Sequence, residues 1–177
     1  MDTQQLDRAA KSDGLLRQYF GGVFAVDRLP KHAEHLAYIV NLDNADKAGS
    51  HWIAIFFSSD RQNVDYFDSY GSPPNNIHLT RFLKRNSVFK NYNKLALQSP
   101  CSTVCGQFTL FFLWHRIRGF PMKRIQSKFN LRKLPLNDLQ VARFAEKHFN
   151  FIHHGPYFDQ DCIQSCVALM PPATCIF

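Results

Sequence analysis

The stretch from Cys105 to Trp114 constrains the fold of this chain most, because it predicts a helix that is apolar on nearly every side. Such a helix is typical of the middle of a domain, where other elements surround it. The preceding loop, 98–104, places Cys105 in the first turn. A thiol at a helix N-terminus lies near unpaired N–H groups and the positive end of the helix dipole, which favour the thiolate. Cys105 is therefore a candidate nucleophile, with an inert buried cysteine as the alternative.

The pattern of apolar runs predicts a sheet built around one hairpin. Residues 51–58 form the strongest predicted strand, because β-branched and aromatic residues fill a short apolar run. Residues 64–68 form the next strand, so 51–68 is predicted to be a hairpin. Further extended segments are predicted at 24–29, 36–42 and 92–97.

Helical periodicity predicts the remaining elements. The segment 3–19 is amphipathic, with Thr3 as its cap, Gly14 as a break and Gly21-Gly22 as its end. Further helices are predicted at 77–86 after the cap Asn76, from Cys105 to near Gly119, and at 138–149 after the cap Asn137. Residues 123–129 are short and basic, and residues 153–177 show no periodicity. This order of elements predicts a single α+β domain over residues 1–177.

Charge and cysteine content suggest partners and a compartment. With 21 Lys and Arg against 14 Asp and Glu, the net charge is +7, which indicates an anionic partner such as DNA, or only a basic soluble surface. The densest basic cluster, a candidate DNA-binding surface or a solvated face, comprises Lys123, Arg124, Lys128, Arg132 and Lys133.

The N-terminus lacks a signal-peptide pattern, and no apolar run is long enough to span a bilayer. The odd number of cysteines, at 101, 105, 162, 166 and 175, then predicts a reducing intracellular compartment and mostly free thiols. The four-residue spacing of two cysteine pairs is a weak zinc pattern, so no metal site is predicted.

Four polar residues at the ends of these elements form a candidate catalytic set. His51 opens one strand of the hairpin and Asp68 ends the other, so a tight turn near residue 60 would place them almost opposite each other. A carboxylate there would fix the imidazole tautomer for a Cys105 thiolate. The amide of Gln98, seven residues before Cys105, could donate to an oxyanion together with the Cys105 N–H. Singly, each has an ordinary reading: a surface histidine, a turn aspartate and a loop glutamine.

These motifs resemble the adenovirus protease (adenain) family and, more broadly, the Ulp1-type proteases of ubiquitin-like modifiers. The residues that carry the resemblance are His51-Trp52, then Tyr66 to Gly71 (Tyr-Phe-Asp-Ser-Tyr-Gly), then Gln98 and Cys105-Gly106-x-Phe108. The resemblance covers roughly residues 33–120. It implies a papain-like or Ulp1-like fold, with a central mixed sheet packed against the helix that carries the nucleophile. Adenoviral members typically have Glu where this chain has Asp68, which leaves the branch of the family open.

The resemblance also implies roles for single residues. Cys105 would be the nucleophile, His51 the general base and then acid, Asp68 its orienting group, and Gln98 an oxyanion donor. Trp52 and Gly106 would lie along the substrate groove, where Gly106 would let a substrate backbone approach closely.

Family membership would imply cleavage of capsid and core precursor proteins during virion maturation, near small residues such as Gly. Such a monomeric enzyme would need no cofactor for its chemistry, although DNA or a short viral peptide could stimulate it. It would work in the host nucleus and the virion. Two alternatives are an isopeptidase that removes ubiquitin-like modifiers and a DNA-binding structural protein with a dead protease fold.

Overall fold

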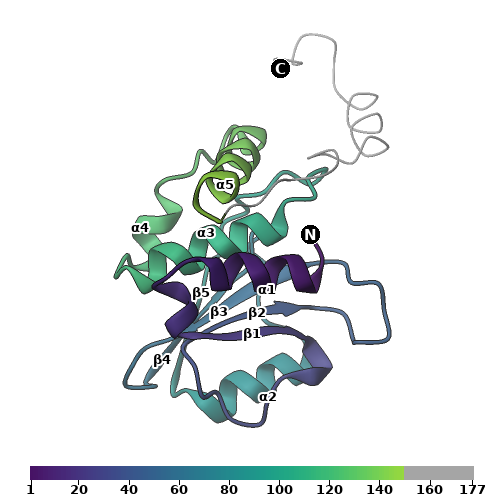
Figure 1. The fold of residues 1–177 in the computed structure, drawn as a ribbon, viewed down its shortest axis with the longest axis vertical. Helices are drawn as coiled ribbons and strands as arrows, with labels where there is room; N and C mark the ends of the chain where they lie inside the picture. The colour runs from purple at the N-terminus through teal and green to yellow at the C-terminus, as the bar shows by residue number, and fades with distance from the viewer. Residues whose placement is uncertain (150–177) are drawn as a thin grey trace.

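The centre of the molecule is a five-stranded mixed sheet with strand order β1-β2-β3-β4-β5 and helices on both faces (Figure 1). The computed structural model describes residues 1–149. The outer pairs β1/β2 and β4/β5 are parallel, and the inner pairs β2/β3 and β3/β4 are antiparallel. The strands are β1 (Phe20–Ala25), β2 (Ala37–Asn41), β3 (Trp52–Phe57), β4 (Asn63–Phe67) and β5 (Phe89–Tyr92). The helices are α1 (Thr3–Ser12), α2 (Ile77–Asn86), α3 (Cys105–Ile117), α4 (Met122–Gln126) and α5 (Leu134–Phe149), with 3-10 turns at Leu16–Gln18 and Val26–Arg28.

Both faces of β3 are buried, which explains why its sequence is apolar without interruption. Side chains alternate between the two faces of a strand. Those of Trp52, Ala54 and Phe56 join the core that contains α1, α3 and α5, and those of the residues between them join the core that contains α2. Figure 1 shows α1 and α3 on one face of the sheet and α2 on the other.

Helix α3 lies between the sheet and α5, as its apolar surface predicts (Figure 1). The ring of Phe112 stacks on Phe67 of β4 with centroids 4.5 Å apart. The polar end of the helix is held by ion pairs, in which Arg116 Nε donates to Asp65 at 2.7 Å and Arg118 donates to Asp13 at 2.7 Å. The helix that carries Cys105 is therefore fixed along its whole length.

The predicted hairpin over 51–68 is confirmed, whereas the predicted strand at 92–97 is wrong. The last strand is β5, from Phe89 to Tyr92, which pairs with β4. After β5, residues 93–98 form no strand, and individual hydrogen bonds fix their position. The Asn93 side chain bonds the backbone of Asp68, and the N–H groups of Leu97 and Gln98 both donate to the carbonyl of Ser69.

Several predicted helix boundaries differ from the observed ones because particular side chains make other contacts. Asp2, not Thr3, caps α1, since its carboxylate accepts from the N–H of Gln5 and the Gln5 side chain accepts in return. The helix ends at Ser12, before Gly14, so it does not continue to 19. Asn137 does not cap α5, which begins at Leu134; its buried amide bonds the backbone of Leu97 and Asn130 instead.

Gly21 and Gly22 lie within β1 and do not end the preceding segment, so the extended segment begins at Phe20 and not at Phe24. A side chain at Gly21 would have its Cβ 2.3 Å from the ring of Tyr38 on β2, so only glycine fits there. Gly22 has φ of +127°, which side chains rarely allow.

The predictions for residues 153–177 and for Cys162, Cys166 and Cys175 lie outside the described residues. The assignment of the whole chain to one domain stays a prediction for the same reason. No helix within residues 1–149 combines the length and apolar character that crossing a membrane requires.

Candidate active site

His51 and Asp68 lie just beyond the ends of β3 and β4, where the two strands leave the sheet. Ala54 is opposite Phe67 in the register, so His51 and Asp68 are diagonal neighbours, almost opposite each other as predicted. Their side chains still meet, because diagonal positions across a strand pair are within reach of long side chains. His51 Nε2 is 2.8 Å from Asp68 Oδ1. The predicted histidine–carboxylate pair is thus present.

The Asp68 carboxylate is buried and held from several directions. Oδ1 accepts from the Tyr70 N–H at 2.8 Å, and Oδ2 accepts from the Tyr66 hydroxyl at 3.4 Å. The Asn93 side chain accepts from the Asp68 N–H at 2.8 Å and donates to its carbonyl at 2.5 Å. These bonds leave the carboxylate one orientation, which in turn fixes the imidazole of His51.

Cys105 is the first residue of α3 and a free thiol, and it is hydrogen-bonded to His51. Since Nε2 of His51 bonds Asp68, its other nitrogen, Nδ1, is the one left for the sulfur. The loop before α3 also carries Cys101, which is disulfide-bonded, so the expectation of free thiols fails for that residue.

The electrostatics of the pair favour a thiolate and an imidazolium. Burial raises the pKa of Cys105, but the hydrogen bond and charge of His51, the Trp52 N–H and the N-terminal amine outweigh it and lower the pKa. Burial likewise opposes the charged form of His51, yet hydrogen bonds with Asp68 and Cys105 raise its pKa to about 9. Both shifts favour a proton on the imidazole over one on the sulfur.

Tyr70 is a further site residue that sequence reasoning did not single out. Its ring lies on the His51 imidazole with centroids 4.8 Å apart, and its hydroxyl donates to the Ser102 carbonyl at 3.4 Å. Burial and the negative charges of Cys105, Asp138 and Asp68 raise the pKa of Tyr70 to about 12. The signal that could have found it is its place two residues after Asp68, at the same strand end.

Gln98 lies in the loop before Cys105 and is buried. Its Oε1 accepts from the Ser69 hydroxyl at 2.6 Å, and its Nε2 donates to the Ser102 carbonyl at 2.8 Å. The orientation of the amide is thereby fixed, with the carbonyl oxygen turned to Ser69. The role of Gln98 as an oxyanion donor stays a prediction.

Asp138 of α5 was predicted only as a helix residue, yet it contacts the same loop. It is fully buried, accepts from the Ser99 N–H at 3.3 Å and bonds the Ser102 side chain. Burial raises its pKa to about 7, against the opposing effect of these hydrogen bonds. No sequence pattern marked this residue, because its partners are 39 and 36 positions away.

Trp52 and Gly106, the predicted groove residues, are both buried beside the first residue of the chain. The Trp52 indole donates to the Met1 carbonyl at 3.1 Å. A Cβ at Gly106 would lie 2.9 Å from Met1 Sδ and 3.2 Å from Leu6 Cδ2. The glycine therefore makes room for Met1 and for Leu6 of α1, and a role in substrate binding stays a prediction.

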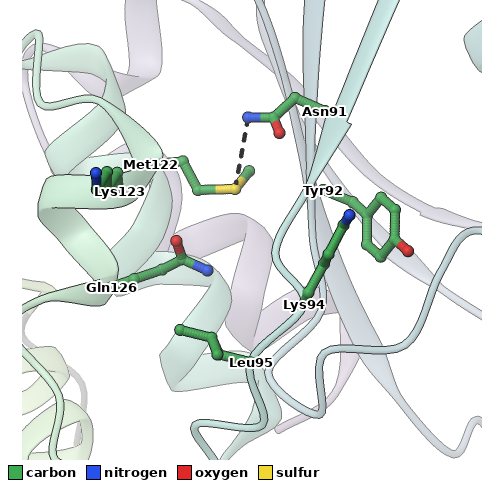
Figure 2. A pocket seen from close by; sticks show the side chains of 7 residues that line it. All are labelled: Asn91, Tyr92, Lys94, Leu95, Met122, Lys123 and Gln126. Carbon is green, nitrogen blue, oxygen red and sulfur yellow. Dashed lines mark hydrogen bonds between the residues drawn. The ribbon is translucent and has the colours of Figure 1, made fainter.

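The five residues of the basic cluster are all exposed, on α4 and on the segment that leads to α5. The charged groups of Arg124 and Lys128 both lie over the ring of Phe120, at 4.8 and 5.5 Å. Lys123 also lines a cavity of about 290 Å³ between β5 and α4, opposite Lys94 (Figure 2). The cavity is lined by Asn91, Tyr92, Lys94, Leu95, Met122, Lys123 and Gln126.

Within residues 1–149, no three His, Cys, Asp or Glu side chains gather in a way that could hold a metal ion. The chemistry that the described site itself supports is that of a sulfur nucleophile paired with an imidazole.

Comparison with known proteins relates this site to viral proteases. A family model described as adenovirus endoprotease matches residues 20–158. A protein of Acanthamoeba polyphaga mimivirus described as a thiol protease is 32% identical over 129 residues, which cover 68% of this chain and 42% of that protein. The chain thus spans about two fifths of the mimivirus protein. The protease of Bovine adenovirus B serotype 3 is 22% identical over 179 aligned residues, covering 84% of this chain and 85% of that one.

Solved structures support the fold. The crystal structure of a protease of ASFV has a TM-score of 0.60 and 18% identity, covering 86% of this chain and 67% of that chain. This likeness concerns the fold alone, and it confirms the predicted α+β cysteine-protease fold. The family model matches most of the chain, from β1 through α5. The resemblance read from the sequence is therefore correct, and the chain belongs to the adenovirus endoprotease family.

Proposed function

We propose that this chain is a cysteine endopeptidase in which Cys105, His51 and Asp68 carry out the reaction. The observation that carries the proposal is the partly buried imidazole of His51, hydrogen-bonded to the Cys105 sulfur on one side and to Asp68 on the other. A thiolate, an imidazole and an orienting carboxylate are the three groups that such a reaction requires. The same arrangement argues against a dead protease fold that only binds DNA.

The reaction would follow from the charges at the site. The Cys105 thiolate attacks the peptide carbonyl and forms a C–S bond, and the carbonyl oxygen becomes an oxyanion. The Cys105 N–H and the amide of Gln98 are the proposed donors to that oxyanion. The imidazolium of His51 then gives its proton to the departing amine, which leaves a thioester. Water, deprotonated by His51, hydrolyses the thioester and restores the thiolate.

For the substrates, we propose capsid and core precursor proteins cut during virion maturation, near small residues such as Gly. Support comes from family membership and from the viral source of the relatives. A place of action in the host nucleus and the virion belongs to the same proposal. Trp52, next to His51, is the proposed groove residue, and displacement of Met1 would expose its indole.

DNA is the proposed partner of the exposed basic cluster. The cluster adds to the chain's net charge of +7, and Lys94 extends it across the cavity of Figure 2. Each phosphate contact made by Lys or Arg releases counterions, so binding should weaken steeply with salt. Replacing Lys123, Arg124 and Lys128 by Ala should flatten the salt dependence of binding to a duplex. A short viral peptide is the other proposed activator. Cleavage rates measured with the peptide, with a DNA duplex, with both and with neither test the two proposals.

The decisive experiment compares cleavage by wild type and by Cys105→Ala. Labelled casein tests for endopeptidase activity, and a ubiquitin-like modifier with an electrophile after its Gly-Gly end tests for the isopeptidase alternative. We expect casein cleavage that disappears in Cys105→Ala. Modifier labelling at Cys105 without casein cleavage would favour the isopeptidase instead. A wild type that shows neither reaction would contradict the proposal.

A further inference from the structure

Asp138 is a buried carboxylate whose position in the fold the proposed reaction does not explain. Its side chain is fully buried, and none of the ion pairs within residues 1–149 includes it. Burying a carboxylate without a cation is unfavourable unless hydrogen bonds compensate for the lost water. It is hydrogen-bonded to Ser99 and Ser102, in the loop that leads directly into Cys105.

The hydrogen bonds of Ser102 show what Asp138 accepts. Ser102 Oγ accepts from the Val104 N–H and from Gln98 Nε2, both at 3.4 Å. A hydroxyl has two acceptor sites and one donor. Both acceptor sites are therefore occupied, and the O–H is left to donate to Asp138. Asp138 then accepts from the Ser102 hydroxyl and the Ser99 N–H together, and the Ser99 N–H is 3.3 Å from both of its oxygens. Asparagine would place an NH2 group, which is a donor, where one of these oxygens faces a donor.

Ser102 also forms hydrogen bonds with residues that lie close to the Cys105 sulfur. Its carbonyl accepts from Gln98 Nε2 at 2.8 Å and from the Tyr70 hydroxyl at 3.4 Å. The second N–H of Gln98 Nε2 makes only the long 3.4 Å contact with Ser102 Oγ, so it is the one that would turn to an oxyanion. Val104, whose N–H donates to Ser102 Oγ, is the residue that precedes α3. Ser102 is thus a common hydrogen-bond partner of the Gln98 amide and of the residue that precedes α3. Asp138 of α5 is hydrogen-bonded to Ser102 in turn.

We propose that Asp138 is a positioning residue for the reaction at Cys105, because its carboxylate holds the loop in the form that aims the oxyanion donors. The inference rests on the proposed function, in which Gln98 and the Cys105 N–H stabilise an oxyanion. Asp138 bonds neither Cys105 nor His51 in the structure. Its loss should therefore impair oxyanion stabilisation and leave the thiolate intact.

Two reactions of the same sulfur separate these effects. Iodoacetamide alkylates a thiolate by direct displacement, in which a C–S bond forms, iodide leaves and no oxyanion arises. With p-nitrophenyl acetate, the sulfur attacks the ester carbonyl, an oxyanion forms, and p-nitrophenolate leaves as the thioester forms. For Asp138→Asn we expect alkylation at Cys105 within about twofold of wild type and acylation slower by about tenfold or more. Losing an oxyanion donor outright slows reactions by roughly 10²–10³, and a misplaced donor should have a smaller effect.

Asp65→Asn is the matched control. Asp65 is also a buried carboxylate, but it accepts from Arg116 Nε at 2.7 Å and Asn91 Nδ2 at 2.9 Å, away from the loop. Its replacement should lower stability and leave the ratio of acylation to alkylation unchanged. A purely structural role for Asp138 predicts the same unchanged ratio, which makes the ratio the deciding quantity.

Ser102→Ala is the second variant, since it removes the hydroxyl that links Asp138 to Gln98 and Val104. It should reproduce the selective loss of acylation, and it carries the test if circular dichroism shows that Asp138→Asn does not fold. Equal loss of both rates, or no loss of either, in the folded variants would overturn the proposal.

The same measurements keep this inference apart from the peptidase assignment. A wild type that is acylated by the ester but cuts no protein would overturn that assignment, while the ratio test for Asp138 would still apply. A wild type acylated no faster than Cys105→Ala would overturn both.

Discussion

The two sides of Cys105 are built in different ways. On one side, His51 and Asp68 lie at the ends of two adjacent strands of one hairpin, and the sheet ladder sets their separation. On the other side, Gln98 lies in an irregular loop, which side-chain hydrogen bonds hold to Ser69, Ser102 and, through Ser102, to Asp138 of α5. We call these the sheet side and the loop side.

The difference separates two parts of the chemistry. The sheet side contacts the sulfur through His51 and sets the charge of the thiolate and imidazolium, because its groups raise the pKa of His51 and lower that of Cys105. The loop side places the amide of Gln98 and, on our proposal, governs the oxyanion. Changes on the sheet side should therefore alter how the sulfur ionises, and changes on the loop side should alter how well the oxyanion is stabilised once the sulfur has attacked.

Both sides act on the Cys105 sulfur, so its removal should give the largest effect. For Cys105→Ala we expect proteolysis to fall by roughly 10⁴–10⁶, as is usual when the nucleophile of a catalytic set is lost. Initial rates of cleavage of a labelled protein substrate measure the change. Activity that persists near the wild-type level would mean that another group is the nucleophile.

Asp68→Asn breaks the sheet side while it preserves shape. An amide can donate to His51 Nε2 and would favour the wrong tautomer, so kcat/KM should fall by roughly 10²–10⁴. Alkylation by iodoacetamide should slow as well, unlike the expectation for Asp138→Asn. Asp60→Asn, at the exposed turn of the same hairpin, is the control and should leave both rates near wild type. Unchanged alkylation in Asp68→Asn would contradict the division into two sides.

The pH dependence of stability tests the charge on the loop side. The pKa of Asp138 is raised to about 7, so its neutral form stabilises the folded state below pH 4, and this contribution is lost as pH rises through 7. The amide of Asp138→Asn does not titrate. From pH 4 to pH 8, the free energy of unfolding of this variant should therefore rise relative to wild type, by up to about 4 kcal/mol. Urea titrations at both pH values measure it, and a difference that is independent of pH would contradict the buried carboxylate.

The pH dependence of activity tests the sheet side. Because hydrogen bonds with Asp68 and Cys105 raise the pKa of His51 to about 9, the imidazolium should persist through neutral pH, and kcat/KM should fall above about pH 9. In Asp68→Asn one of these causes is removed, so the falling limb should move to lower pH. A limb that stays in place would show that Asp68 does not hold the proton on His51.

Two tyrosine hydroxyls test the division with the smallest expected effects. Each makes one hydrogen bond of 3.4 Å, Tyr66 on the sheet side and Tyr70 on the loop side. Tyr66 donates to Asp68 Oδ2 and Tyr70 donates to the Ser102 carbonyl. Each Tyr→Phe change should have an effect of about two- to fivefold, as expected for a weak hydrogen bond. Tyr66→Phe should slow alkylation, whereas Tyr70→Phe should slow only acylation by p-nitrophenyl acetate. The reverse pattern would contradict the assignment of the two sides.

The sheet side could be read from the sequence because its information is local. A hairpin brings residues 17 positions apart together, and alternating strand geometry indicates which ends meet. The exact register could not be read, and the structure shows that His51 and Asp68 are diagonal neighbours. The apolar surface of α3 likewise predicted its burial without reference to any other element.

The loop side could not be read in this way. The bond from Ser99 to Asp138 joins residues 39 positions apart, and it depends on how α5 packs. Asn137 also appeared in the sequence as a helix cap, although its amide joins the backbone of Leu97 and Asn130. Tertiary contacts of this kind override local preferences and leave no periodic signal.

The contact between Met1 and Trp52 has a practical consequence for anyone who handles this protein. The Met1 carbonyl accepts from the Trp52 indole, and its side chain lies over Gly106, next to the nucleophile. Residues joined ahead of Met1, whether a purification tag or a fusion partner, would begin beside Trp52 and Gly106, the sequence neighbours of His51 and Cys105. Samples that carry such an extension should be assayed again after its proteolytic removal before their rates are compared.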